Sequence, residues 1–308
     1  MNLIYSNQLI KSPLNYIGGK YKILNQILPL FPSNINKFVD LFAGGCNVGI
    51  NVNAKNIVFN DNLTYLVDMY KAFQLNSITA TIDHIEDRIV EFKLSLTNDL
   101  GYKKIRDLYN REKNPLDLFV LIAYTFNHQI RFNSSHYFNN PFGKDRSSFN
   151  KKMNDNLVRF ISKIKEKNIE FTSSTFEDFN FSHFSQKDFV YCDPPYLITT
   201  GSYNDGKRGF KGWTTKEEKT LHNILDKLHI QGVRFALSNV LDHKGKSNDI
   251  LKEWLARNSN YNVNHLNFHY SNSSYNTMDR DKKSSTEVLI TNYSPQTDKS
   301  FISLKKEL

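Results

Sequence analysis

The chain has 308 residues, 39% of them hydrophobic, which is enough to bury a large core in one α/β domain with an insertion or in two domains. Its 40 Lys and Arg against 31 Asp and Glu give a net charge of +9, which is compatible with a polyanionic partner without proving one. No run of about 18 apolar residues and no secretory pattern is present, so a cytoplasmic protein without membrane contact is expected.

The first predicted elements are a glycine-containing loop and a helix. Residues 15–20 hold two glycines and Lys20, and apolar residues follow at helical spacing up to Pro29. Residues 38–42 are then predicted to form a strand, and residues 43–49 a Gly-rich turn that leads into a helix. Amides exposed at such a helix N-terminus suit a polar ligand tail.

A second strand is predicted over residues 56–61 and ends in Asp61. An acid at the end of the second strand of a βαβ unit can bind both hydroxyls of a ribose. The glycine spacing is not G-x-G-x-x-G, which disfavours a dinucleotide-dependent dehydrogenase. Together, the order of these elements favours a cofactor that contains a nucleoside.

The middle of the chain, residues 63–168, is predicted to be a helical insertion, because apolar side chains recur there at helical spacing. Within it, residues 126–133 and 137–144 have the composition of a hairpin whose amides and guanidinium could contact base edges in a major groove. Lys144 opens a basic stretch suited either to phosphates or to a solvated surface. His128 and His136 lack Cys or acid partners at ligand spacing, so no metal site is expected.

Residues 189–192 are predicted to form a buried strand that stops at Asp193-Pro194-Pro195-Tyr196. A carboxylate and a proline carbonyl could grip the two hydrogens of an exocyclic amine, and Tyr196 could stack on the base. These residues therefore suggest methylation of an amino nitrogen. A strand that simply ends in a proline-rich turn would look the same.

The remaining chain is predicted to return to α/β character. A helix is expected around residues 221–228, a strand over 234–239, a helix around 250–254 and an antiparallel pair over 264–270 and 287–293. The segment 199–212, with Tyr203, Lys207, Arg208 and Lys211, could close over an extruded nucleotide or be a surface loop. Cys46 and Cys192 are expected to be packing residues.

Taken in order, residues 15–20, residues 38–49, Asp61 and residues 193–196 resemble the Dam-type family (D12 class, alpha group) of DNA adenine-N6 methyltransferases. The resemblance covers about residues 15–293 and implies a Rossmann-like class I S-adenosylmethionine-dependent methyltransferase sheet with a helical target-recognition insertion. Residues 1–62 and 169–308 would form the catalytic domain, and 63–168 the DNA target-recognition domain.

Several site residues follow from the resemblance alone. It implies that S-adenosylmethionine is contacted by Tyr16, Lys20, Asp40, Phe42, Gly44, Asp61, Phe176 and Asp193, although Phe176 could equally be a core aromatic. It implies a catalytic role for Asp193, Pro194 and Tyr196. The residues that correspond to the family's DNA-contacting hairpin, together with their polar neighbours, are Asn127, Gln129, Arg131, Asn133, Pro141, Gly143 and Lys144.

The expected function is therefore site-specific transfer of a methyl group to N6 of a flipped adenine in double-stranded DNA, in a restriction-modification or Dam-like system and without a metal. A separately acting restriction endonuclease is a candidate partner. Arg131 agrees with relatives that read GATC, but Asn15 stands where some of them carry lysine, so the recognition sequence stays open. Two alternatives remain: a same-fold enzyme acting on cytosine N4 or an RNA base, and a non-catalytic DNA-binding protein.

Overall fold

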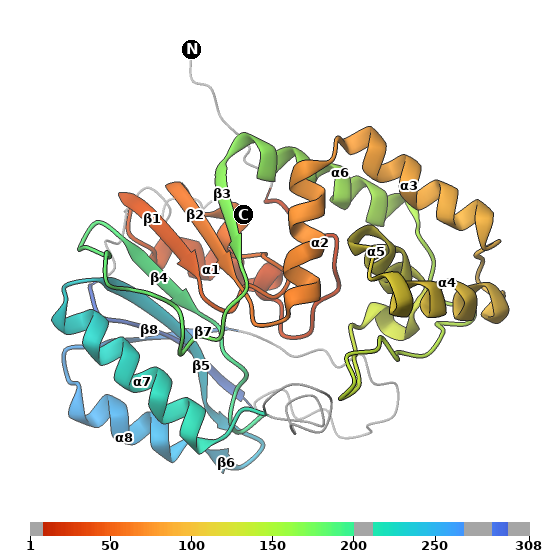
Figure 1. The fold of residues 1–308 in the computed structure, drawn as a ribbon. Coiled ribbons are helices and arrows are strands. Elements are labelled where there is room, and N and C mark those ends of the chain that lie inside the picture. The colour runs from red at the N-terminus through yellow and green to blue at the C-terminus, as the bar shows by residue number, and fades with distance from the viewer. Residues whose placement is uncertain (1–8, 200–211, 268–284, 295–308) are drawn as a thin grey trace, which may run out of the picture. The chain divides into compact units, whose positions relative to one another are not determined.

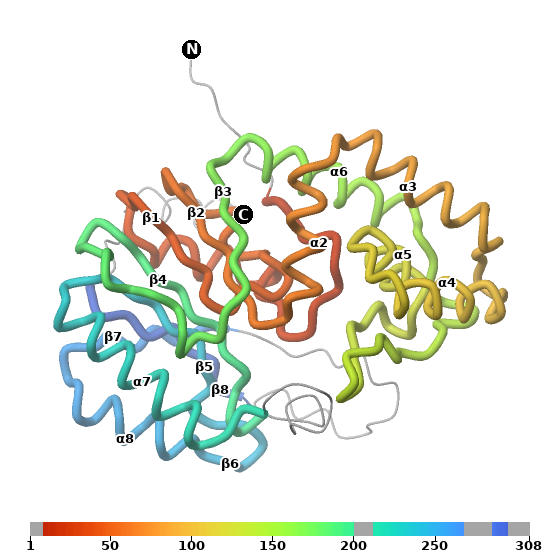
Figure 2. The backbone as a smooth tube through the Cα atoms, viewed as in Figure 1, coloured from red at the N-terminus to blue at the C-terminus, as the bar shows by residue number. Residues whose placement is uncertain are grey.

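A computed structural model describes residues 9–199, 212–267 and 285–294, and its secondary structure is mixed α/β, as predicted. The chain divides into two compact units (Figures 1 and 2). The first unit comprises Met1–Tyr21, Ala43–Val52 and Asn56–Ser174, and the second comprises Lys22–Phe42, Asn53–Lys55 and Thr175–Leu308.

The first unit is built around one buried helix, α5 (Pro115–Tyr124), whose residues 116–124 are all buried. A helix that is apolar on every side belongs in a core, and α5 packs against α2, α3 and α4. The other helices of this unit are α2 (Thr64–Leu75), α3 (Ile78–Glu91), α4 (Asp99–Glu112) and α6 (Lys151–Glu166).

Asparagine side chains start three of these helices. Asn98, Asn114 and Asn150 each accept a hydrogen bond from a backbone N–H in the first turn of α4, α5 and α6, respectively. Such N-caps are each worth about 1 kcal/mol. The starts of α4, α5 and α6 are therefore set by local side chains.

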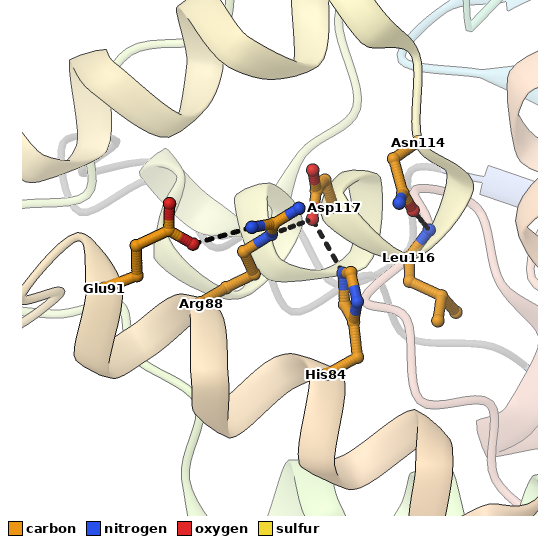
Figure 3. Close-up of polar contacts among 6 residues, drawn as sticks. All are labelled: His84, Arg88, Glu91, Asn114, Leu116 and Asp117. Carbon is orange, nitrogen blue, oxygen red and sulfur yellow. Dashed lines mark hydrogen bonds and ion pairs between the residues drawn. The ribbon is translucent and has the colours of Figure 1, made fainter.

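A buried ion-pair cluster joins α3 to α5 (Figure 3). Asp117 on α5 is fully buried, and its Oδ1 lies 2.7 Å from His84 Nε2 and 2.9 Å from Arg88 Nε. Arg88 Nη1 also lies 2.6 Å from Glu91 Oε2. Because a buried charge is costly unless it is paired, these contacts fix α3 against α5.

Two parallel strands precede and follow the helices of the first unit, and all but the first two residues of the earlier strand belong to that unit. β2 (Ala54–Asn60) pairs with β3 (Asn168–Thr172). Between Asp61 and Lys167, all of which the structure describes, the chain forms helices and loops but no strand. The prediction of a helical stretch between two parts of α/β character is thereby confirmed, whereas the functional domain boundaries stay a prediction.

The second unit contains a mixed sheet in the order β1-β4-β5-β8-β7. β1 (Ile35–Asp40), β4 (Phe189–Cys192) and β5 (Arg234–His243) are parallel. β8 (Ser285–Thr291) runs antiparallel to β5 and to β7 (Asn262–Leu266), which confirms the predicted antiparallel pair within the described residues. The short β6 (Lys246–Ser247) pairs with β5.

Two helices, α7 (Thr215–Ile230) and α8 (Asp249–Arg257), pack against β5 and against each other (Figure 1). A capping box starts α7, in which the side chains of Thr214 and Glu217 each bond the other's backbone N–H. Its apolar face comprises Leu221, Leu225 and Leu228, as predicted.

Two predicted helices are wrong in detail. The glycine turn leads only into the 3₁₀ turn η3 (Gly49–Asn51), because Gly44 and Cys46 adopt positive φ angles and fold the chain back on itself. The predicted helix after Lys20 consists of η1 (Lys20–Ile23), α1 (Leu24–Ile27) and η2 (Leu28–Leu30), so only its middle is α-helical. Pro29 has no N–H and limits the helical hydrogen bonding at the C-terminal end.

Candidate active site

Asp193 stands at the carboxyl end of β4, whose four residues are all buried. In the parallel register, Asp40 lies opposite Tyr191 and Leu237 opposite Cys192, so β1 and β4 end at the same edge, whereas β5 continues beyond it to His243. Open α/β sheets bind ligands at that edge. Asp40, the last residue of β1, is buried there, and Asp193 is half-buried.

Asp193 is linked through Tyr196 to a second acid, Glu287 on β8. The Tyr196 hydroxyl lies 3.0 Å from Asp193 Oδ1 and 3.1 Å from Glu287 Oε1. Pro194 and Tyr196 are buried, and Glu287 is only 2% exposed. The Tyr196 hydroxyl therefore lies within hydrogen-bonding distance of both carboxyl groups. Because it has one hydrogen, it donates to only one of them at a time.

The sequence did not predict a role for Glu287. The sequence feature that could have pointed to Glu287 is an acid at the start of a predicted strand, directly before the apolar residues 288–290. A buried acid in a strand needs a partner, but the sequence does not say which one.

Cys192 directly precedes Asp193, and its thiol is a poor nucleophile. Burial, followed by the negative charges of Asp40 and Asp193, raises the pKa of Cys192 well above its usual value. Because the thiolate is the nucleophilic form, a high pKa makes Cys192 a poor nucleophile. This agrees with the expectation of a packing role.

Three aromatic rings meet elsewhere in the second unit. The ring centroids of Phe42 and Phe176 are 5.5 Å apart, and Trp213 lies 5.6 Å from Phe42 and 5.3 Å from Phe176. Phe176 and Trp213 are buried, whereas Phe42 is half-buried. The structure thus brings together two residues proposed for the cofactor and adds a third, Trp213, which had no motif to reveal it.

In the first unit, Gly44 is the centre of the glycine turn. Its φ is +46°, and a Cβ added there would lie 2.8 Å from the ring of Tyr16. The Gly44 N–H donates to Asp61 Oδ2 at 2.9 Å, and its carbonyl accepts from the Tyr70 hydroxyl at 2.8 Å. Only glycine fits this position without strain.

Asp61 directly follows β2 and is held by two backbone amides. Oδ2 accepts from Gly44 and Oδ1 accepts from Leu63 at 2.9 Å. Burial raises the pKa of Asp61, and the two hydrogen bonds, from Leu63 and Gly44, act against that rise. A carboxylate has about four acceptor positions, so two backbone bonds leave it able to accept ribose hydroxyls.

The segment before the first helix is pinned to the glycine turn. The Ser12 N–H donates to Asn47 Oδ1 at 2.9 Å, and Asn51 bonds both backbone groups of Ile10 at 2.8 Å. Lys20 is buried, and its Nζ donates to the Gly18 carbonyl at 2.9 Å. Tyr16 and Lys20 are therefore held in the same unit as Gly44 and Asp61.

The predicted hairpin is an irregular loop with two isolated bridges, Thr125 with Phe142 and Phe132 with Phe138. Its centre is Asn140, which is buried and was not predicted. Asn140 Nδ2 lies 2.5 Å from Thr125 Oγ1, 3.2 Å from the Phe126 carbonyl and 3.0 Å from the Gln129 carbonyl. One amide thus determines the shape of the loop.

The polar side chains of the loop are partly used within it. Arg131 donates from Nε and Nη2 to Asn139, at 2.9 Å each, which occupies two of its five N–H donors. Asn133 Oδ1 accepts the N–H groups of residues 135 and 137 and so closes a turn. Asn127 has a φ of 56°, and its Oδ1 accepts from Arg146 at 3.1 Å.

The other predicted DNA-binding residues also lie in this loop. Gln129 is half-buried, while Pro141 and Lys144 are exposed. The Pro141 carbonyl accepts from Phe126 N–H and Thr125 Oγ1. A Cβ on Gly143 would lie 2.2 Å from Ser147 Oγ, which explains a glycine there without invoking DNA.

Other predictions are not tested by these contacts. Tyr203, Lys207, Arg208 and Lys211 lie outside the described residues. Across residues 9–199, 212–267 and 285–294, no three His, Cys, Asp or Glu side chains are grouped so as to hold a metal ion. No helix in the described part of the chain is long and apolar enough to cross a membrane.

Comparison with known proteins gives a family match over nearly the whole chain. The model for the D12 class N6 adenine-specific DNA methyltransferases matches residues 16–293. The chain is 55% identical over 292 residues to the type II methyltransferase M.FokI of Planomicrobium okeanokoites, and 53% identical over 292 residues to the modification methylase StsI of Streptococcus sanguinis. Both alignments cover 95% of this chain but only 44% of the relative.

A third relative is similar in length. The type II methyltransferase M1.LlaDCHI of Lactococcus lactis subsp. cremoris is 25% identical over 298 residues, which cover 95% of this chain and 99% of that protein. The chain therefore spans less than half the length of M.FokI and StsI, and nearly all of M1.LlaDCHI.

Proposed function

The chain belongs to the D12 class N6 adenine-specific DNA methyltransferases, and from that premise we propose that it methylates N6 of an adenine at a specific site in double-stranded DNA. The observation that carries the proposal is the family match over residues 16–293, which includes Asp193 at the carboxyl end of β4. The names of the relatives, a type II methyltransferase and a modification methylase, support a role in restriction-modification. A separately acting endonuclease is part of the proposal and has no support from these names. Such a methyltransferase would act in the cytoplasm.

S-adenosylmethionine is the proposed methyl donor, and the donor and acceptor groups present suit it. The Asp61 carboxylate suits a ribose, and the turn at Gly44 admits no side chain beside Tyr16. Aromatic rings such as Phe42 and Phe176 suit an adenine. The family resemblance also assigns Tyr16, Lys20 and Gly44 of the first unit, and Asp40 and Asp193 of the second, to contacts with S-adenosylmethionine. When bound, this cofactor would supply an electrophilic methyl group.

Asp193 and Pro194 have the proposed task of orienting the target amine. The lone pair of an adenine N6 is delocalised into the ring, so acceptors that hold its two hydrogens favour the pyramidal form that attacks. The Asp193 carboxylate and the Pro194 carbonyl are such acceptors. Tyr196 fixes Asp193 through its hydroxyl and presents its ring to the flipped base. Asp193 or solvent takes the proton released after transfer.

Residues 63–168 have the proposed task of target recognition, and residues 1–62 and 169–308 that of catalysis. Arg131 keeps N–H donors beyond the two used by Asn139, so a contact to a guanine edge is compatible with its position. Exposed Lys144 suits a phosphate. Asn127, Gln129, Asn133 and Pro141 belong to the same proposed DNA-contacting loop.

Sequencing that detects modified bases tests the proposal. The full chain is expressed in cells that lack adenine methylation, beside Asp193→Asn and the matched control Asp155→Asn, whose acid is exposed on α6. We expect N6-methyladenine in one short motif, lost in Asp193→Asn and retained in Asp155→Asn. Modified cytosine would favour the cytosine-N4 alternative, and methylation that survives Asp193→Asn would refute the assigned role of Asp193.

A further inference from the structure

Trp213 completes an aromatic cluster in which two of the three rings are already proposed for the cofactor. Its indole lies edge-on to Phe42, with an interplanar angle of 80°, and at 47° to Phe176. The three centroid distances, from 5.3 to 5.6 Å, describe a nearly equilateral triangle of rings. Trp213 therefore lies beside both of the rings that are proposed for the cofactor.

The buried carboxylate of Glu218 accepts a hydrogen bond from the Trp213 indole. The Trp213 Nε1–H donates to Glu218 Oε2 at 2.6 Å, and Glu218 is 1% exposed. The other carboxylate oxygen accepts from Asn239 Nδ2 at 2.9 Å and Asn248 Nδ2 at 3.3 Å. Donors from β5 and from the N-cap of α8 therefore fix Glu218, and Glu218 in turn fixes the indole.

The backbone beside Trp213 is fixed as well. Thr214 is the N-cap of α7 and forms the capping box with Glu217, one residue before Glu218. An indole whose N–H is bonded to a buried carboxylate and whose neighbour is a helix cap has few alternative rotamers. These contacts hold the indole in one orientation beside Phe42 and Phe176.

We propose that Trp213 is a third aromatic wall for the adenine ring of the methyl donor, and that Glu218 is the positioning residue that holds it. This inference rests on the proposed function and deepens it. It makes the aromatic cluster of the second unit responsible for recognising the adenine ring.

Fluorescence gives a readout that is independent of methyl transfer. The chain has two tryptophans, and Trp254, on α8, stacks on His222 and donates to Asp226. In a Trp254→Phe protein, all tryptophan emission comes from Trp213. We expect S-adenosylmethionine to change that emission with the same Kd that calorimetry gives.

Binding by calorimetry then separates a ligand wall from a packing residue. We expect Trp213→Leu to weaken the Kd for S-adenosylmethionine by about tenfold, Trp213→Phe by less, and Glu218→Ala by about three- to tenfold. Trp254→Leu is the matched control, since it also removes a buried indole but should leave the Kd within about twofold.

The outcomes distinguish the two proposals. If the unaltered chain does not bind S-adenosylmethionine, the cofactor assignment fails and this inference fails with it. If it binds, but Trp213 emission does not respond and Trp213→Leu leaves the Kd unchanged, only the inference is overturned. Equal losses of affinity in Trp213→Leu and Trp254→Leu would also overturn it, because they would reflect lost stability.

Discussion

The hydroxyl of Tyr196 offers a direct test of how the catalytic acid is held. Tyr196→Phe removes one oxygen and leaves the ring in place. It takes away the group that bridges Asp193 and Glu287 at 3.0 and 3.1 Å. Hydrogen bonds to charged groups contribute about 1.5–3 kcal/mol, and a buried acceptor that loses a donor costs a similar amount.

These magnitudes predict two separate effects. If about 2 kcal/mol of the interaction orients Asp193 in the transition state, kcat falls by about 30-fold, because 1.36 kcal/mol corresponds to tenfold. The free energy of unfolding falls by about 1–3 kcal/mol, because Glu287 is buried. The KM for the methyl donor should stay within about twofold.

Single-turnover transfer of a labelled methyl group into duplex DNA measures the first effect, and urea denaturation measures the second. Tyr293→Phe is the matched control, because its hydroxyl donates to the Leu30 carbonyl at 2.9 Å and touches no acid. It should lose stability but keep kcat. If Tyr196→Phe behaves like Tyr293→Phe, its hydroxyl only supports the fold, and the reasoning about Asp193 is refuted.

Three further predictions concern other parts of the chain. Gly44→Ala should lower the free energy of unfolding, measured by urea denaturation, by about 2–4 kcal/mol, because the new Cβ would collide with Tyr16 in addition to the strained φ. The control Gly245→Ala should lower it by only about 1 kcal/mol, because Gly245 has a φ of +77° but open space around it. Asn140→Ala should weaken DNA binding in a filter-binding assay more than it weakens cofactor binding, because it removes the amide that shapes the loop; equal losses would contradict this. Burial lowers the pKa of His222 from 6.5 to about 3, so the unfolded chain binds the proton more readily and stability should fall as pH drops below about 6.5, by up to about 1.4 kcal/mol per pH unit. Urea denaturation between pH 4 and 7 measures this, and a His222→Phe protein with an unchanged pH profile would contradict it.

The sequence by itself determined the features that depend on neighbours in the chain. The strand β4 follows from a short apolar run, the helices α2, α4 and α5 follow from apolar residues at helical spacing, and the antiparallel pair β7 and β8 was also predicted from the sequence. The order of the short motifs around Gly44, Asp61 and Asp193 was sufficient to indicate the family that the comparison found. These features can be predicted without a structure because each depends on residues within a short stretch of the chain.

Only the tertiary structure decided which distant side chains meet. Tyr196 bonds Glu287, 91 residues away, and Glu218 bonds Asn239 across 21 residues, and no periodicity encodes either pair. The predicted helix after the glycine turn failed for a related reason. Gly44 takes a positive φ because Tyr16, Asp61 and Tyr70 close around it, and those contacts come from three separate segments of the chain.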